Sequence, residues 1–221
     1  MLSRDEYLAA WSRWHGDTPT DGALVRGWLT AAWTLARPLA GLPPLVATGF
    51  GLLVAAAAVP VAGAGGVWLI VAGLLVGLSG LLDSLDGALA IGTGRASRRG
   101  FVLDSVVDRL SEVAYAAALW VAGAPGWLAV VFGALCWLPD YLRARAGQAG
   151  VSETGVLSVW ERPMRVAMTG MTLGGAGVLA AIPAGRDAVD TVITSGAAVG
   201  SVLGVVAVVQ LGFSLRRMLG D

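Results

Sequence analysis

Six long apolar segments constrain the fold of this chain more than any other feature. They cover roughly 44–62, 66–90, 101–122, 126–142, 164–183 and 191–214. About 20 apolar residues are enough for a helix to cross the hydrocarbon core of a bilayer. Only 14% of the residues are charged, whereas soluble domains carry about 25%. We therefore predict an all-α integral membrane protein with six transmembrane helices, in which residues 1–221 form a single domain and residues 44–214 the bundle.

The connections between these segments alternate in charge. Arginines gather in the second and fourth connections and after the last segment: Arg95, Arg98, Arg99, Arg143, Arg145, Arg162, Arg165, Arg216 and Arg217. The first and third connections carry no charge, and the fifth has one arginine, Arg186. Because cytoplasmic loops are rich in arginine and lysine, this pattern predicts a multi-pass protein of the cell membrane with both termini in the cytoplasm. The 15 basic and 15 acidic residues balance, which excludes nucleic-acid binding through a bulk positive field.

Residues 1–40 are expected to lie at the membrane surface rather than to cross it. Only ten residues separate Arg26 from Arg37, and a helix of that length spans about 15 Å, half of the hydrocarbon core. Nearer the N-terminus, Ser3 and Glu6 form a capping-box pattern. Apolar side chains then recur at helical spacing at Tyr7, Leu8, Trp11 and Trp14. This pattern predicts an N-terminal amphipathic helix that lies in the interface.

Four aspartates fall within or beside the apolar segments: Asp83, Asp86, Asp104 and Asp108. The first two are three residues apart and the last two are four apart, so each pair shares one face of a helix. The short loop between them makes the two helices antiparallel neighbours, and both pairs are expected at a similar depth. Carboxylates that face one another repel unless they are protonated or bind cations. An all-oxygen ligand set favours Mg²⁺ or Mn²⁺, although helix capping and pairing with nearby arginines are alternative roles.

The spacing of these aspartates matches a known signature. From residue 83 the chain reads Asp-Ser-Leu-Asp-Gly-Ala-Leu-Ala-Ile, then eight residues, then Gly-Phe-Val-Leu-Asp-Ser-Val-Val-Asp. This resembles the pattern of the CDP-alcohol phosphotransferase family, DxxDGxxAR, eight residues, GxxxDxxxD, at seven of its eight fixed positions. The family's arginine is Ile91 in this chain. Arg95 can substitute for it only if the helix continues that far, and without a substitute a non-catalytic family member is the alternative.

The resemblance implies a six-helix membrane fold and a reaction. A phosphatidyl group would pass from CDP-diacylglycerol to a polar alcohol, and CMP would be released on the cytoplasmic side. The four aspartates would hold two Mg²⁺ or Mn²⁺ ions, and Asp108 would take the proton of the acceptor hydroxyl. The nucleotide would lie against Thr48, Gly87, Ala90 and Gly100. Similar enzymes are homodimers, so a homodimer is also expected.

Two further segments bear on the acceptor. Residues 141–146 and 161–165 resemble the YxxARA and ERxxR segments of bacterial phosphatidylinositol-phosphate synthases, in which such arginines hold the phosphate of the acceptor. The resemblance therefore assigns Arg143, Arg162 and Arg165 to the acceptor phosphate and favours inositol phosphate. Glycerol 3-phosphate is the alternative acceptor, and the arginines could also act only as topology signals. A divalent-cation transporter also needs acids within the membrane, but it would place them near the middle of the bilayer.

Overall fold

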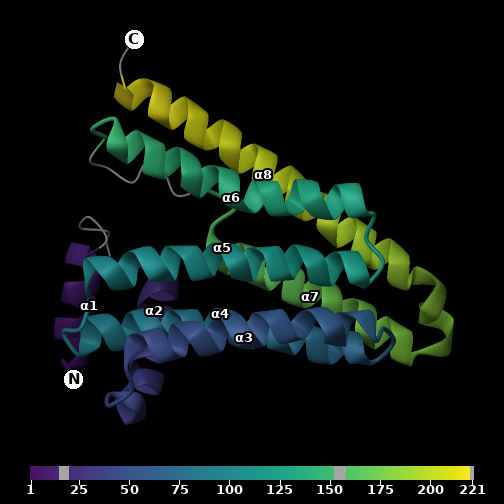
Figure 1. The fold of residues 1–221 in the computed structure, drawn as a ribbon, viewed down its shortest axis with the longest axis horizontal. Coiled ribbons are helices and arrows are strands. Elements are labelled where there is room, and N and C mark those ends of the chain that lie inside the picture. The colour runs from purple at the N-terminus through teal and green to yellow at the C-terminus, as the bar shows by residue number, and fades with distance from the viewer. Residues whose placement is uncertain (15–19, 152–157, 220–221) are drawn as a thin grey trace. The chain divides into compact units, whose positions relative to one another are not determined.

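The computed structural model describes residues 1–14, 20–151 and 158–219, and in these residues the regular secondary structure consists of helices (Figure 1). Its eight α-helices are α1 (Arg4–Trp14), α2 (Ala23–Ala36), α3 (Pro44–Gly63), α4 (Trp68–Gly92), α5 (Arg98–Val121), α6 (Gly126–Gln148), α7 (Arg162–Ala181) and α8 (Val189–Leu219). Short 3-10 helices cover Arg37–Leu39 and Pro183–Ala188. The predicted all-α class is confirmed, and each of the six apolar segments forms a helix.

Within the part of the chain that the structure describes, three helical stretches are long and apolar enough to cross a membrane: Pro44–Gly63, Trp68–Gly92 and Pro183–Leu219. They confirm a membrane protein. Helices α5, α6 and α7 are also long, but charged and small polar residues lower their hydropathy. Helix α6 continues to Gln148, beyond its predicted end at 142. The sequence predicts Arg143 and Arg145 in the connection after this segment. They lie instead on the last turns of α6.

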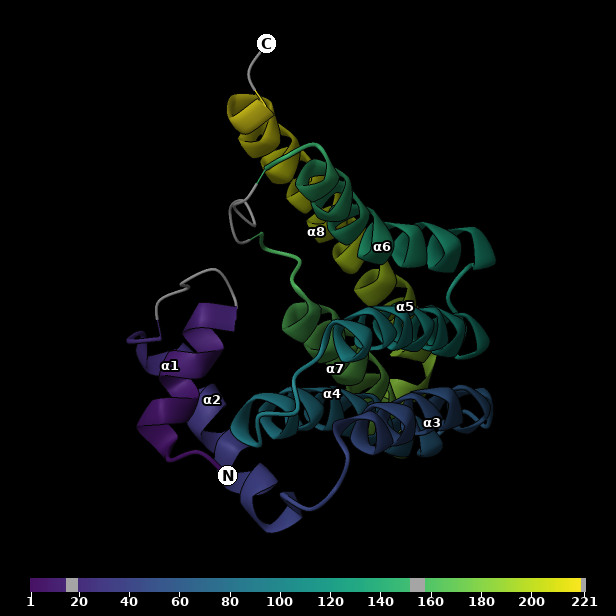
Figure 2. The same ribbon diagram turned by 60° about the vertical axis from the view of Figure 1, so that its left-hand side comes forward.

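The chain separates into two compact units, and α3, α4 and α5 each contribute to both. The first unit consists of Met1–Leu53 and Leu78–Asp108, and the second of Val54–Gly77 and Arg109–Asp221. In the first unit α1 lies beside α2 (Figures 1 and 2). The core of this unit is formed by α1, α2 and the ends of α3 and α4, through Tyr7, Leu8, Leu29, Ala32, Ala36, Ala47, Leu85, Ala88, Leu89 and Ile91.

The N-terminal helix has the predicted cap but a different partner for its apolar face. The backbone N–H of Ser3 donates to the Glu6 carboxylate at 2.8 Å, and these Ser3 hydrogen bonds lower the pKa of Glu6. However, Tyr7 and Leu8 are only 1% and 5% exposed, because they pack in the core of the first unit. The expectation that this face rests on the membrane surface is therefore wrong for these two side chains. Trp14 remains exposed.

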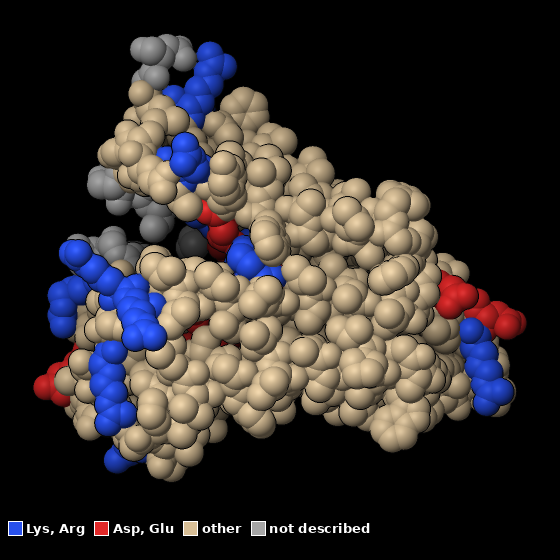
Figure 3. All heavy atoms as spheres, viewed as in Figure 1, with Lys and Arg blue, Asp and Glu red and all other residues tan. Residues whose placement is uncertain are grey.

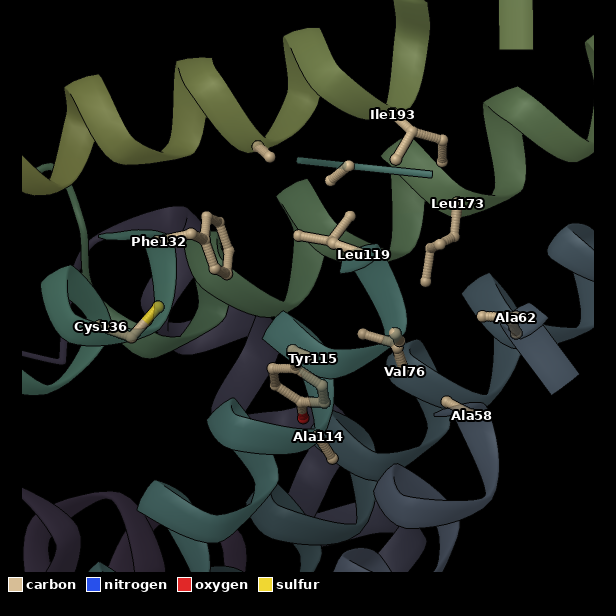
Figure 4. Packing of buried hydrophobic residues seen from close by; sticks show 14 of the residues in the cluster. Ala58, Ala62, Val76, Ala114, Tyr115, Leu119, Phe132, Cys136, Leu173 and Ile193 are labelled. Carbon is tan, nitrogen blue, oxygen red and sulfur yellow. The ribbon is translucent and has the colours of Figure 1, made fainter. Parts of the chain in front are cut away.

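In the second unit, a core of buried residues joins α5, α6, α7 and α8 to parts of α3 and α4 (Figure 4). Phe132 and Trp160 meet edge to face, with ring centroids 5.6 Å apart. Glycines allow close approach of α4 and α7, because a Cβ added at Gly177 would lie 2.5 Å from the backbone nitrogen of Ile70. Close helix contacts at small residues are typical of packing in membranes.

The outer face of α6 suits contact with lipid. Trp127 and Val130, near the start of this helix, are 69% and 72% exposed. In Figure 3 the surface along this half of α6 carries uncharged atoms. An apolar exposed surface of this kind is expected of a helix that faces hydrocarbon.

Candidate active site

Three of the four signature aspartates come together in the first unit. Asp83 projects from α4, and Asp104 and Asp108 lie one turn apart on α5. One carboxylate oxygen of each lies within 4.8 Å of the others, so that they could hold a metal ion. The predicted convergence of acids from two neighbouring helices is confirmed for these three residues.

The fourth aspartate, Asp86, is buried beside this group. Its side chain is 5% exposed, and its carboxylate interacts with the Thr48 hydroxyl and with the charges of the other three aspartates. Its Oδ2 atom is buried without a hydrogen-bond partner. A buried carboxylate oxygen without a partner is costly unless a cation or a proton compensates it. The donor set therefore fits hard divalent ions, which prefer oxygen ligands.

The predicted nucleotide-binding residues lie in the same unit. Thr48 is buried, and its hydroxyl donates to the Pro44 carbonyl at 3.1 Å. A Cβ added at Gly87 would meet no atom within 4 Å, so there is open space beside this glycine. At the start of α5, the backbone N–H of Gly100 instead donates to the Ser97 hydroxyl oxygen at 3.0 Å. Ala90 is half-buried on α4.

Arg95 does not take the place of the family's arginine. Helix α4 ends at Gly92, and Gly94 adopts a left-handed φ of +66° just beyond it. The Arg95 backbone N–H closes this end by donating to the Ala90 carbonyl at 2.8 Å, as in a Schellman motif. The exposed Arg95 side chain donates to the Leu42 carbonyl at 3.3 Å. Ile91 itself is 8% exposed in the core of the first unit. Because α4 ends at Gly92 and does not reach Arg95, the longer helix that the substitution would need is not present.

The second unit contains a buried network of charges around Arg165 on α7. This side chain is fully buried. Its Nη1 donates to Glu112 Oε1 at 2.6 Å and to Asp140 Oδ2 at 2.7 Å, and its Nε donates to the Trp160 carbonyl at 2.9 Å. Arg109 Nη1 pairs with the same two carboxylates, at 3.0 Å from Glu112 Oε2 and 2.6 Å from Asp140 Oδ2. These contacts tie α5, α6 and α7 together.

Arg143 extends this network toward the segment before α7. Its Nη1 lies 3.2 Å from Asp140 Oδ1, and its Nη2 lies 2.5 Å from Glu161 Oε1. Glu161 also accepts hydrogen bonds from the backbone and the hydroxyl of Ser158, both at 2.8 Å. Partial burial opposes ionisation of Glu161, but the Arg143 and Ser158 hydrogen bonds outweigh it, so the pKa of Glu161 lies below its usual value of 4.5. Arg162 begins α7 and is half-buried.

The sequence assigns no site role to Arg109, and for Asp140 and Glu112 it favours a helix-end charge and a hydrogen-bond partner over a place in the site. The available signal was Glu112, an acid in the middle of a predicted transmembrane segment. Such a residue requires a partner of opposite charge, and Arg109 is one turn earlier on the same helix. The sequence alone does not show that Asp140 and Arg165, from two other helices, complete the group.

The chain is similar to known proteins over most of its length. Residues 41–209 match the model of the CDP-alcohol phosphatidyltransferase family. The archaetidylinositol phosphate synthase of Aeropyrum pernix is 40% identical over 82 residues, which cover 37% of this chain and 42% of that enzyme. The matched segments span about half, or less, of the length of the curated relatives.

Two crystal structures of the Mycobacterium tuberculosis phosphatidylinositol phosphate synthase share the fold. The structure with bound CDP-DAG is 27% identical, with a TM-score of 0.65, and the match covers 83% of this chain and 92% of that one. The structure in complex with manganese and citrate is 26% identical, also with a TM-score of 0.65, and the match covers 83% of this chain and 88% of that one.

Proposed function

Because the chain belongs to the CDP-alcohol phosphatidyltransferase family, we propose that it transfers a phosphatidyl group from CDP-diacylglycerol to inositol phosphate and releases CMP. The observation that carries this proposal is the group formed by Asp83, Asp104 and Asp108, at the spacing of the family signature. The names of the relatives support the acceptor, since they are inositol phosphate lipid synthases. Glycerol 3-phosphate remains the alternative acceptor.

The aspartates would act as a metal site with a base at its edge. Asp83, Asp86, Asp104 and Asp108 would hold two Mg²⁺ or Mn²⁺ ions, and the manganese complex of a solved relative supports this. Bound metal would neutralise the pyrophosphate and the charge that develops on the leaving CMP. The Asp108 carboxylate would accept the proton of the acceptor hydroxyl.

The remaining predicted residues would bind the two substrates. The open space beside Gly87, together with Thr48, Ala90 and Gly100, would accommodate the nucleotide. Arg143, Arg162 and Arg165 would bind the acceptor phosphate, because guanidinium groups bind phosphate oxygens in pairs. For Arg165 this role falls to Nη2, since its Nε and Nη1 are already bound to protein oxygens.

The arrangement in the membrane is part of the proposal. Helices α5, α6 and α7 would cross the bilayer together with α3, α4 and α8, with both termini and the aspartates on the cytoplasmic side. A lipid pyrophosphate at headgroup depth and a soluble acceptor would both reach such a site. The active form would be a homodimer, as the family resemblance implies.

The test is an assay of lipid products. Purified protein is incubated with CDP-diacylglycerol, Mg²⁺ and a panel that includes inositol phosphate, glycerol 3-phosphate and inositol, and the lipids are identified by mass spectrometry. We expect a phosphatidylinositol phosphate product and stoichiometric CMP. Asp108→Asn should abolish the product while the protein remains folded in detergent, and Asp187→Asn, at an exposed position, should not. Failure to form a lipid product with every acceptor would overturn the proposal.

A further inference from the structure

Asp140 occupies a distinctive position in the charge network of the second unit. Its Oδ2 accepts from Arg109 at 2.6 Å and from Arg165 at 2.7 Å, and its Oδ1 lies 3.2 Å from Arg143. Arg109 belongs to α5, Arg143 to α6 and Arg165 to α7. A single carboxylate therefore holds guanidinium groups from three helices.

The exposure of the network shows on which side it is open. The side chains of Glu112 and Arg165 are fully buried, whereas the side chain of Asp140 is 35% exposed. The side chains of Arg109 and Arg143 are 20% and 19% exposed. Glu112 thus balances charge at the closed end of the network. Asp140 lies at its accessible end, where a soluble ligand would arrive.

The network also retains capacity for an anion. Three arginines, Arg109, Arg143 and Arg165, pair with three carboxylates, those of Glu112, Asp140 and Glu161, and the positive charge of Arg162 also acts on Glu112. A guanidinium group has five N–H donors. In Arg165 the buried Nη2 has no hydrogen-bond partner, although the rest of the group is bound. A buried donor of this kind can bind a water molecule or an anion.

We propose that Asp140 is a positioning residue that gathers the guanidinium groups of Arg109, Arg143 and Arg165 into one anion-binding set for the acceptor phosphate. Like charges repel at these distances, so without the shared carboxylate the three groups would separate. The phosphate would then lose donors that are already in place. This inference rests on the proposed function, because it concerns the binding of a phosphorylated acceptor.

The test compares Asp140→Asn with Asp187→Asn, which makes the same chemical change at an exposed position of the turn Pro183–Ala188. In Asp140→Asn the apparent KM for inositol phosphate should rise about tenfold or more, as expected for the loss of a charge-assisted contact. The KM for CDP-diacylglycerol and the kcat at saturating acceptor should change less than about twofold, because the effect lies in acceptor binding. Inorganic phosphate should compete with the acceptor about tenfold more weakly. Asp187→Asn should match the wild type.

A purely structural role would give a different result, namely a lower kcat or a lower thermal stability of the folded protein with an unchanged acceptor KM. That result in folded Asp140→Asn protein would overturn the inference and leave the proposed function intact. If no phosphorylated acceptor is used by the wild type, the proposed function fails first. If Asp140→Asn does not fold, the same kinetic measurements are made on Glu161→Gln. This variant weakens the other anchor of Arg143 and should raise the acceptor KM severalfold, and an unchanged KM would overturn the inference.

Discussion

Glu112 offers a direct test of how the buried charges contribute to stability. Its carboxylate is fully buried and contacts Arg165 at 2.6 Å and Arg109 at 3.0 Å. Replacing it by leucine removes the counter-charge at the closed end of the network, and leaves Asp140 to balance both guanidinium groups. Breaking a buried ion pair from one side costs about 3–5 kcal/mol, because the remaining charge stays desolvated. Since Arg165 keeps its bonds to Asp140 and Trp160, we expect a cost of about 3 kcal/mol, at the lower end of this range.

The measurement is thermal unfolding in detergent, followed by tryptophan fluorescence. A loss of about 3 kcal/mol corresponds to a decrease of about 6–12 °C in Tm for a domain of this size. The double variant Glu112→Leu, Arg165→Met removes both partners and should recover more than half of this decrease, because buried ion pairs are often replaceable by apolar groups. A double variant whose Tm falls by the sum of the two single effects would refute the reasoning. In that case the two side chains would be energetically independent.

Two further predictions concern packing and pH. Gly177→Ala should lower the stability by about 1–3 kcal/mol, as for overpacked cores, because its Cβ would collide with the backbone at Ile70. Gly175→Ala on the same helix meets no atom within 4 Å and should not lower Tm, and equal effects would contradict the close approach of α4 and α7. The pKa of Glu161 is lowered in the folded state, so its contribution to stability should be complete above pH 4.5 and disappear as the pH falls through the lowered pKa. The Tm difference between wild type and Glu161→Gln should therefore be constant near pH 7 and shrink below pH 4.5. A difference that stays constant in acid would exclude an ionic role for Glu161.

The helices are well predicted because they depend on the length of each apolar segment and on capping residues beside it, both of which are local in the sequence. Ser3 and Glu6 form the expected cap, and the spacing of Asp104 and Asp108 places both on one face of α5. The convergence with Asp83 follows from the short connection between two antiparallel helices. These features depend on residues that lie close together in the sequence.

The features that the sequence does not predict depend on contacts between distant segments. An arginine near the end of an apolar segment is the same topology signal whether its side chain points to water or into the protein. The Arg165 side chain points into the protein, where it pairs with Glu112 and Asp140. In the same way, the apolar side of α1 could face lipid or protein. It faces protein because Leu89 and Ile91 of α4 form part of the same core. The end of α4 before Arg95 depends on the left-handed conformation of Gly94.

The first residues of the chain are attached to the helix that carries Asp83 and Asp86. The Leu2 backbone N–H donates to the Gly92 carbonyl at 2.7 Å, and the Leu2 carbonyl accepts from the Trp33 indole at 3.0 Å. A shortened version that starts after α1 would lose these two hydrogen bonds and the Met1 side chain that lies against Gly92, and would release this end of α4. Truncation or a bulky fusion at this end is thus expected to disturb Asp83 and Asp86, the proposed metal ligands, more than 80 positions away in the chain.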